Sequence, residues 1–266
     1  MRFALSAEQA DFGAVLHGFL AQGRRDLAAV GVGDVSDPVD LVVVFEELGH
    51  HAVDGPVVET YAVGPALGIG GSVAFPPHVP HAAEADRYHL VEGTTLREAT
   101  PVTTHASVDP ARTLVEVTGG PVVATDVPAA RAFDLGVLAC SAQLLGLGRA
   151  MLELTTAHAK TRVQFGRPIG SFQAVKHHLA DVLIGLELAR PLVFGAAVTM
   201  APRDVSAAKV ATSEAAWRAA RTALQVHGAI GYTAEYELSR FLVRTRALRT
   251  AWGSLSFHRN RVLEAL

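Results

Sequence analysis

The chain is largely apolar over residues 128–161, which are predicted to form one long helix. Over residues 172–200 apolar residues recur at three- and four-residue intervals, from Val175 to Val193, a spacing that predicts a second, amphipathic helix. Pro191 stands inside the second segment, and we expect it to kink that helix or to end its first part. The second half of the chain is therefore predicted to be almost entirely helical.

The rest of the second half also has helical spacing. Asp204 is expected to cap a third helix that runs to about His227. Two shorter helices, over residues 234–249 and 254–265, complete the chain. Long helices with short connections predict an up-down four-helix bundle over residues 128–266.

The N-terminal region, residues 1–67, is also predicted to be helical. Ser6 and Gln9 have the spacing of a capping box, which opens an amphipathic helix toward Gln22. A second helix is predicted over residues 39–50. Glycines and a proline separate the two, so we expect a short helix and a loop between them.

The middle of the chain, residues 68–127, changes to short β-type runs between glycines and prolines. The runs at 72–76, 88–93, 113–119 and 121–125 are predicted to be strands. Four or five short strands make a small β segment rather than an independent domain. The predicted fold class is therefore mainly α, with N-terminal helices, a reduced middle β segment and a C-terminal helical bundle.

Composition narrows the possible functions. Lys and Arg number 23 and Asp and Glu number 26, for a formal net charge of −3, so neither nucleic acid nor an anionic membrane is an expected partner. The uncharged apolar stretch 135–148 is shorter than a membrane span. A secretory signal would need an uninterrupted apolar stretch near the start of the chain, and Glu8 and Asp11 interrupt it. Because Cys140 is the single cysteine, an internal disulfide framework is excluded. We therefore expect a cytoplasmic protein with a buried, inert thiol.

General motifs for cofactors and metals are weak. The glycine-rich GIGGS at residues 68–72 precedes a predicted strand, so it is interpreted as a turn rather than a phosphate loop. His50–His51 and His177–His178 are adjacent pairs, and neighbouring residues on a helix point about 100° apart. Such a pair alone makes a poor metal site, so no metal ligand is expected.

Two stretches are more distinctive: RVQFGRPIGSFQ at residues 162–173 and QVHGAIGYTAEY at residues 225–236. Together with EELG at residues 46–49, they resemble the acyl-CoA dehydrogenase family of flavoproteins, whose members carry RxxFGxPIxxFQ and QxxGGxGY in this order. The resemblance implies the acyl-CoA dehydrogenase fold and α,β-desaturation of an acyl-CoA thioester. It also implies an electron-transferring flavoprotein as the electron acceptor.

The resemblance further implies that FAD is shared at a subunit interface. Arg162 would clamp the pyrophosphate, and Phe165 would offer a flat apolar face. Gln173 and Gln225 would supply amide donors and acceptors, and Gly228 would allow the backbone to approach closely. These five residues are the candidate cofactor contacts.

A structural interpretation of the same region stays open. Arg162, Arg240 and Arg244 would also suit salt bridges within the bundle. Ala229 replaces the second glycine of the family pattern, and we expect it to crowd the backbone where FAD approaches.

The catalytic base that the family needs is missing. At the family's usual spacing after Gln225, the glutamate is replaced by Trp252, which cannot accept a proton. The alternative position on the helix before RxxFG is Gly136. The middle of the chain, residues 68–127, also lacks the flavin-facing segment that the family carries there. No catalytic residue is therefore assigned in this chain.

Three functions remain open. The favoured one is a shortened, non-catalytic subunit of an α2β2 acyl-CoA dehydrogenase, similar to those of steroid side-chain catabolism, whose partner supplies the base and most of the FAD pocket. The second is a self-sufficient homo-oligomer with a relocated base, for which Asp134 and Glu235 are candidates. The third is a non-enzymatic assembly protein that kept the bundle. Each requires an oligomer, because so apolar a chain buries surface against a partner.

Overall fold

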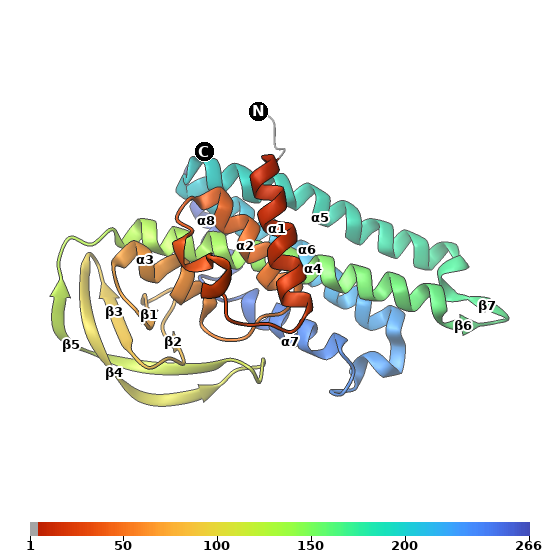
Figure 1. Cartoon of the computed structure of the whole chain (residues 1–266), viewed down its shortest axis with the longest axis horizontal. Coiled ribbons are helices and arrows are strands. Elements are labelled where there is room, and N and C mark those ends of the chain that lie inside the picture. The colour runs from red at the N-terminus through yellow and green to blue at the C-terminus, as the bar shows by residue number, and fades with distance from the viewer. Residues whose placement is uncertain (1–4) are drawn as a thin grey trace.

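The computed structural model describes residues 5–266, in which a long helical bundle carries a small sheet at one end (Figure 1). The helices are α1 (Ala7–Ala21), α2 (Pro38–His50), α3 (Gly64–Leu67), α4 (Ala129–Thr161), α5 (Gln173–Thr199), α6 (Pro202–His227), α7 (Leu238–Leu248) and α8 (Leu255–Leu263). The mainly helical fold class is confirmed, as is the capping box, in which Ser6 Oγ accepts from the Gln9 backbone N–H.

Helix α4 is the centre of the fold. Its middle is almost completely buried, between α2 on one side and α5 and α6 on the other. Helices α2 and α4 meet backbone to backbone: a Cβ on Gly49 would lie 2.1 Å from the Gln143 carbonyl oxygen, and one on Gly146 would lie 1.9 Å from that of Glu46. Any larger side chain at either glycine would therefore push the two helices apart.

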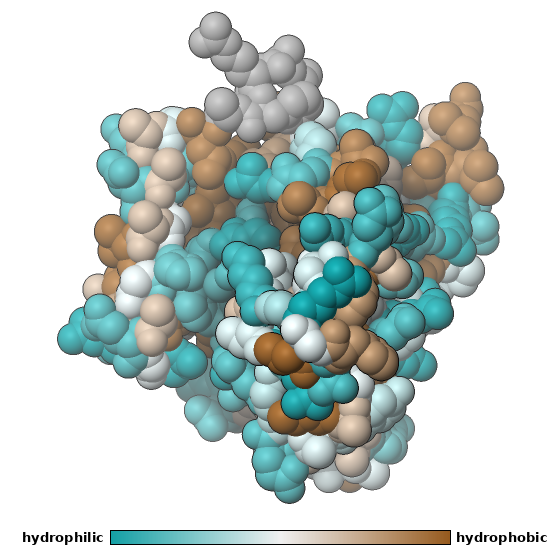
Figure 2. Space-filling view, turned by 90° about the vertical axis from the view of Figure 1, so that its right-hand side faces the viewer, coloured by the Kyte–Doolittle hydropathy of each residue, from teal (hydrophilic) through white to brown (hydrophobic). Residues whose placement is uncertain are grey.

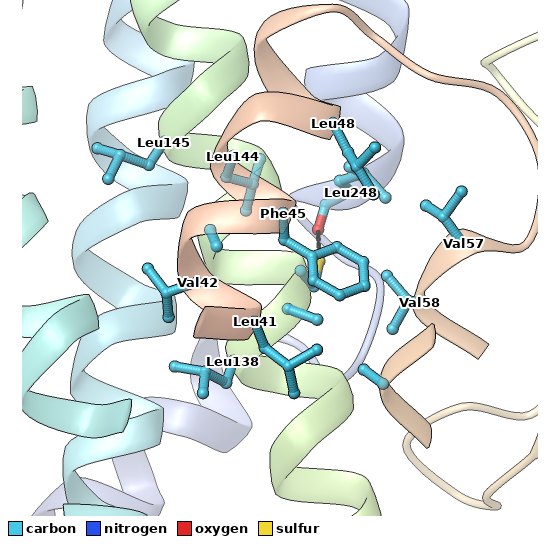
Figure 3. Close-up of a cluster of buried hydrophobic side chains, with 14 of the residues drawn as sticks. Leu41, Val42, Phe45, Leu48, Val57, Val58, Leu138, Leu144, Leu145 and Leu248 are labelled. Carbon is cyan, nitrogen blue, oxygen red and sulfur yellow. Dashed lines mark hydrogen bonds between the residues drawn. The ribbon is translucent and has the colours of Figure 1, made fainter. Parts of the chain in front are cut away.

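The apolar core is continuous across these helices. Figure 3 shows Phe45 and Leu48 of α2 in one apolar cluster with Leu138 and Leu144 of α4 and with Val57. Each of these side chains is buried. The N-terminal helices therefore belong to the same core as the bundle.

The middle segment forms one five-stranded sheet in the order β1-β3-β4-β5-β2 (Figure 1). Its strands are β1 (Ser72–Ala74), β2 (Ala82–Ala83), β3 (Tyr88–Glu92), β4 (Thr95–Ala106) and β5 (Thr113–Ala124). Strand β1 pairs with β3 in parallel, and the other pairs are antiparallel. A separate two-stranded hairpin, β6 (Val163–Gln164) and β7 (Arg167–Pro168), joins α4 to α5.

Several local predictions need correction. Strand β4 was not predicted, because most of it is exposed and it lacks an apolar alternation. Residues 113–119 and 121–125 form one strand rather than two, since β5 continues through Gly120. Helix α5 also continues past Pro191, so the helix does not end there, and the alternative of a kink stays a prediction.

The start of the third bundle helix differs from its prediction as well. The N-cap of α6 is Ala201, and Pro202 follows it in the first turn, where its missing N–H costs nothing. Asp204 lies inside the first turn, where its side chain accepts hydrogen bonds from Thr199 Oγ1 and Arg203 Nε. It therefore ties the α5–α6 connection instead of capping the helix.

Two helices of the described chain, α4 and α5, are long and apolar enough to span a membrane, judged by length and composition alone. In α4 an apolar segment of 18 residues is 89% buried inside the fold, as expected of a core helix. The corresponding segment of α5 is only 39% buried. Its uncovered apolar side chains are Leu183, Ile184, Leu188, Leu192 and Val198.

Candidate functional site

The two positions that the family resemblance gives for a base lie against each other in the structure. Trp252 is 1% exposed, and a Cβ placed on Gly136 would lie 2.4 to 2.8 Å from three atoms of its six-membered ring. The indole therefore fills the space that a side chain at Gly136 would need. No carboxylate stands at either position.

Aromatic packing and one hydrogen bond hold Trp252 in place. Its ring lies 5.8 Å from the Phe75 ring and 6.1 Å from the Phe133 ring, centroid to centroid. Its backbone is left-handed, with φ of 57°, and its carbonyl accepts a hydrogen bond of 2.9 Å from His258 Nε2. His258 Nδ1 lies 3.1 Å from Ser206 Oγ. Because a carbonyl only accepts, His258 carries its proton on Nε2 and accepts from Ser206.

Burial keeps His258 neutral. Its side chain is fully buried, and this lowers its pKa from 6.5 to about 4. Nearby Lys209 and Arg261 lower the pKa further, against the opposing effect of the bond to Trp252. At neutral pH the ring therefore acts as a fixed hydrogen-bond donor that supports the Trp252 backbone.

The candidates for a relocated base do not stand free beside Trp252. Both carboxylate oxygens of Asp134 accept hydrogen bonds from Arg261, at 2.5 and 3.0 Å. Glu235 is exposed, in the loop between the 3-10 turn Gly228–Tyr232 and α7. Asp134 thus serves as the buried half of a partly buried ion pair.

Glu59 is a carboxyl group that sequence reasoning missed. It lies in a π-helical turn, Glu59–Val63, and is 4% exposed. Burial raises its pKa, against the opposing effect of Arg112. Together with Gln143, Arg244 and Trp252 it lines a cavity of about 20 Å³, which has room for about one water molecule. The only sequence signal was a single acidic residue inside an apolar run.

The five predicted cofactor contacts lie elsewhere, at the far end of the bundle. Arg162 is the C-cap of α4, and Gln173 is the first residue of α5. Gly228 is the C-cap of α6, with φ of 65°, and follows Gln225 by three residues. The rings of His158 and His227 stack at 4.3 Å and join the ends of α4 and α6. Figure 2 views the molecule from this side and shows polar and apolar residues intermixed.

An arginine-rich groove surrounds Gln225. Arg218, Arg221 and Arg249 line it with Gln225, and its volume is about 470 Å³. The Arg249 guanidinium lies 5.2 Å from the Trp217 ring, and its Nε is buried without a hydrogen-bond partner in the described chain. Such a groove suits an anionic ligand with a flat ring. The remaining lining residues are His178, Asp181, Glu214 and Thr222.

Phe165 projects from the same end. It stands at the tip of the β6–β7 hairpin, with φ of 53°, and is 92% exposed. The hairpin is braced by Phe172, whose ring lies 4.1 Å from the Arg167 guanidinium. The Phe165 ring is therefore largely open to solvent.

Flavin contact and a salt bridge within the bundle were both open for Arg162, Arg240 and Arg244, and the structure places the three side chains in different surroundings. Arg244 is buried and bonds Asp109, Asp54 and the Val53 carbonyl, so it links α7 to two loops of the fold. Arg240 forms an exposed 3.0 Å pair with Glu237 on its own helix. Arg162 is exposed and forms no ion pair with any residue from 5 to 266.

Comparison with known proteins identifies the family. Residues 125–266 match the acyl-CoA dehydrogenase C-terminal domain. The chain is also 31% identical over 228 residues to acyl-CoA dehydrogenase IpdE2 of Mycobacterium tuberculosis, covering 77% of this chain and 70% of that protein. The chain belongs to the acyl-CoA dehydrogenase family.

Solved structures agree with this acyl-CoA dehydrogenase fold. The ChsE4-ChsE5 complex from Mycobacterium tuberculosis matches with a TM-score of 0.79 and 20% identity, over 99% of this chain and 98% of that one. The Tcur3481-Tcur3483 steroid ACAD matches with a TM-score of 0.73 and 22% identity, over 95% and 86%. The similarity therefore covers the middle segment as well as the bundle.

FAD is the cofactor characteristic of acyl-CoA dehydrogenases, and solved structures with this fold include complexes with FAD and FADH2. The exposed end of this chain fits such a group. Its groove offers three arginines and the Gln225 amide to an anionic cofactor, and one buried guanidinium nitrogen there has no hydrogen-bond partner among residues 5–266. Ala229 is exposed in the turn after α6, so its expected crowding of FAD stays a prediction.

Proposed function

We propose that this chain is the non-catalytic subunit of a heteromeric, FAD-dependent acyl-CoA dehydrogenase, and that it completes the FAD site of a catalytic partner in an α2β2 assembly. The observation that carries the proposal is the packing of Trp252 onto Gly136. Both positions available for a base are filled by groups that cannot accept a proton.

The reaction explains why this matters. Desaturation removes a weakly acidic α-proton, which needs a positioned carboxylate. FAD, when bound, accepts the hydride from the β-carbon. Asp134 is occupied by Arg261, and the indole of Trp252 fills the adjoining space. The proton therefore goes to a carboxylate of the partner subunit.

The residues of this chain that remain suited to FAD all face outward. Arg162 and Gln225 are exposed, and Phe165 projects into solvent. Exposed arginines at a subunit boundary bind a diphosphate that another chain brings to them. In the proposed assembly this end of the bundle neutralises the partner's FAD and holds its orientation.

An apolar stripe on α5 supports the oligomer. The stripe consists of Leu183, Ile184, Leu188 and Leu192, all exposed in the single chain. Apolar side chains at four-residue intervals on an otherwise polar surface are typical of a subunit interface. We propose that a partner chain, rather than a membrane, covers this stripe.

The relatives suggest the substrate class. ChsE4-ChsE5 is a complex of two chains, and the Tcur3481-Tcur3483 protein is a steroid ACAD. By analogy we propose an acyl-CoA thioester with a steroid side chain as substrate. An electron-transferring flavoprotein is the proposed electron acceptor, and the cytoplasm the proposed compartment.

One observation favours a second function, a self-sufficient dehydrogenase with a relocated base. Glu59 is a buried carboxyl group beside Trp252 with a raised pKa, as expected of a tuned base. Its cavity of about 20 Å³ is too small for an acyl chain, so this function needs a rearrangement. The third function, a non-enzymatic assembly protein, predicts no flavin in any oligomer.

The flavin-to-chain ratio tests these functions. We expect the chain purified alone to be colourless, and co-expression with a full-length family member to give a yellow heteromer with dehydrogenase activity. A yellow homo-oligomer with one FAD per chain would contradict the proposal. In that case Glu59→Gln separates the alternatives, because only a self-sufficient enzyme with this base loses its activity while keeping its flavin.

A further inference from the structure

Three histidines and a glutamate meet at the C-terminal ends of α1 and α2. His17 comes from α1, Glu47 and His50 lie on one face of α2, and His51 is the C-cap of α2. One ligand atom of each residue lies within 4.8 Å of the others. An adjacent histidine pair alone makes a poor metal site, but here the pair is joined by two further donors.

The contacts among these groups have the dimensions of a coordination shell. Glu47 Oε2 lies 2.8 Å from His17 Nδ1, which lies 3.1 Å from His51 Nε2. In a tetrahedral zinc site with bonds of about 2.0–2.1 Å, neighbouring ligand atoms lie about 3.3 Å apart. The rings of the three histidines also touch, with centroids 4.6 to 5.1 Å apart. Small side-chain rotations would bring all four donors around one ion.

The groups behind these donors also suit a metal site. His50 Nε2 lies 2.9 Å from Glu153 Oε2 on α4, whereas His50 Nδ1 is buried without a hydrogen-bond partner in the described chain. If Nε2–H donates to the carboxylate, Nδ1 keeps its lone pair for a cation, which is the usual arrangement of a metal-binding histidine. The second oxygen of Glu47 accepts from Arg149 Nη2 at 3.1 Å, which fixes the carboxylate.

Access and protonation are compatible with binding. The His17 side chain is 44% exposed, so an ion can enter, whereas that of Glu47 is only 10% exposed. Burial and the two neighbouring histidines lower the pKa of His51 to about 4, so its ring is neutral at pH 7, as a ligand must be. Arg149 and Arg25 oppose a cation, and the carboxylates of Glu47 and Glu153 offset them.

We infer that His17, Glu47, His50 and His51 form a zinc-binding site that fastens α1 to α2. Three imidazoles and one carboxylate are a borderline donor set that suits Zn²⁺ rather than Ca²⁺ or Mg²⁺. Four protein ligands leave no open position, so the site is structural. It ties the C-terminal end of α1 to the fold, while the 2.7 Å bond from Gln9 to Asp40 ties the other end.

The test is zinc stoichiometry and affinity after stripping with a chelator, measured by metal analysis and by competition with a chromophoric chelator. The wild-type chain is expected to bind one Zn²⁺, to melt at a higher temperature with Zn²⁺ present, and to give a tetrahedral visible spectrum with Co²⁺. His17→Gln is expected to weaken binding roughly 100-fold or more, and Glu153→Gln roughly 10- to 100-fold. His177→Gln, in the other histidine pair, is the matched control and should bind as the wild type does.

Where the chain needs its partner to stay soluble, the same comparison is made on the co-purified complex, and the difference between wild type and His17→Gln gives the zinc due to this site. Circular dichroism checks that each variant is folded. The inference is overturned if the wild-type chain binds no stoichiometric Zn²⁺, or if His17→Gln binds it as tightly as His177→Gln does. Binding without any change in melting temperature would overturn the structural role.

Discussion

The contact between Gly136 and Trp252 predicts a strong energetic coupling between two positions far apart in sequence. Replacing Gly136 by alanine puts a methyl group 2.4 to 2.8 Å from three indole atoms. The indole cannot swing away, because Phe75 and Phe133 pack around it and His258 holds its carbonyl.

The expected magnitude follows from two opposing effects. Alanine in a helix is favoured over glycine by about 0.5–1 kcal/mol. Overpacking in a core costs about 1–3 kcal/mol. We therefore expect Gly136→Ala to lower the free energy of unfolding by about 1–2 kcal/mol. Trp252→Ala alone should cost about 3–5 kcal/mol through the cavity that it leaves.

The double variant isolates the contact. Without the indole, the new methyl group has room, so Gly136→Ala in the Trp252→Ala background should be neutral or slightly stabilising. This gives a coupling energy of about 1–3 kcal/mol, the cost of overpacking alone. Gly18→Ala in α1 is the control: a Cβ there meets no atom of residues 5–266 within 4 Å, so it should stabilise the protein by about 0.5–1 kcal/mol.

The assay is urea unfolding followed by far-ultraviolet circular dichroism, since Trp252 is one of only two tryptophans and its loss would alter fluorescence. Equal destabilisation by Gly136→Ala in both backgrounds would refute the reasoning. Such a result would mean that the helix, and not the indole, requires glycine at this position.

Three further predictions concern the cofactor, pH and stability. Arg162→Ala should weaken flavin retention by the heteromer about 10- to 100-fold, because a charge-assisted contact is lost. Arg240→Ala is the control and should leave flavin retention unchanged. Dialysis followed by flavin fluorescence measures the retention of both variants. His258 has a pKa of 6.5 in the unfolded state and of about 4 in the folded state, so on acidification the unfolded state binds this proton first. The free energy of unfolding should therefore fall by up to about 3 kcal/mol as the pH is lowered from about 6.5 to about 4. His258→Gln should reduce this fall, as measured by urea titrations at each pH. Arg244→Met leaves Asp109 buried without its partner, so it should cost about 3–5 kcal/mol in the same assay, and a loss below about 1 kcal/mol would contradict a buried ion pair.

Local patterns predicted the parts of the fold that local energetics determine. The helices over 128–161 and 39–50 were predicted almost to the residue, because each is an uninterrupted and largely apolar stretch that is buried in the fold. The capping box at Ser6 was predictable from sequence because both of its hydrogen bonds join residues three apart.

Features that depend on distant residues were not predictable in this way. Strand β4 is held by its neighbours β3 and β5 and carries little apolar alternation of its own. The contact of Gly136 with Trp252 joins α4 to the loop after α7, and the histidine cluster joins α1 to α2. The outward position of Arg162 and Phe165 likewise became visible only in the folded chain.

Helix α4 fixes the distance between Gly136 and Arg162. It is one helix of 33 residues, with Gly136 near its start and Arg162 directly after its end. At 1.5 Å per residue these two positions are about 39 Å apart. An FAD molecule whose pyrophosphate meets Arg162 therefore lies far from the space that Trp252 fills. The position without a base and the end of the bundle proposed to meet FAD stand at opposite ends of one continuous helix, so a substitution at one of them should leave the surroundings of the other intact.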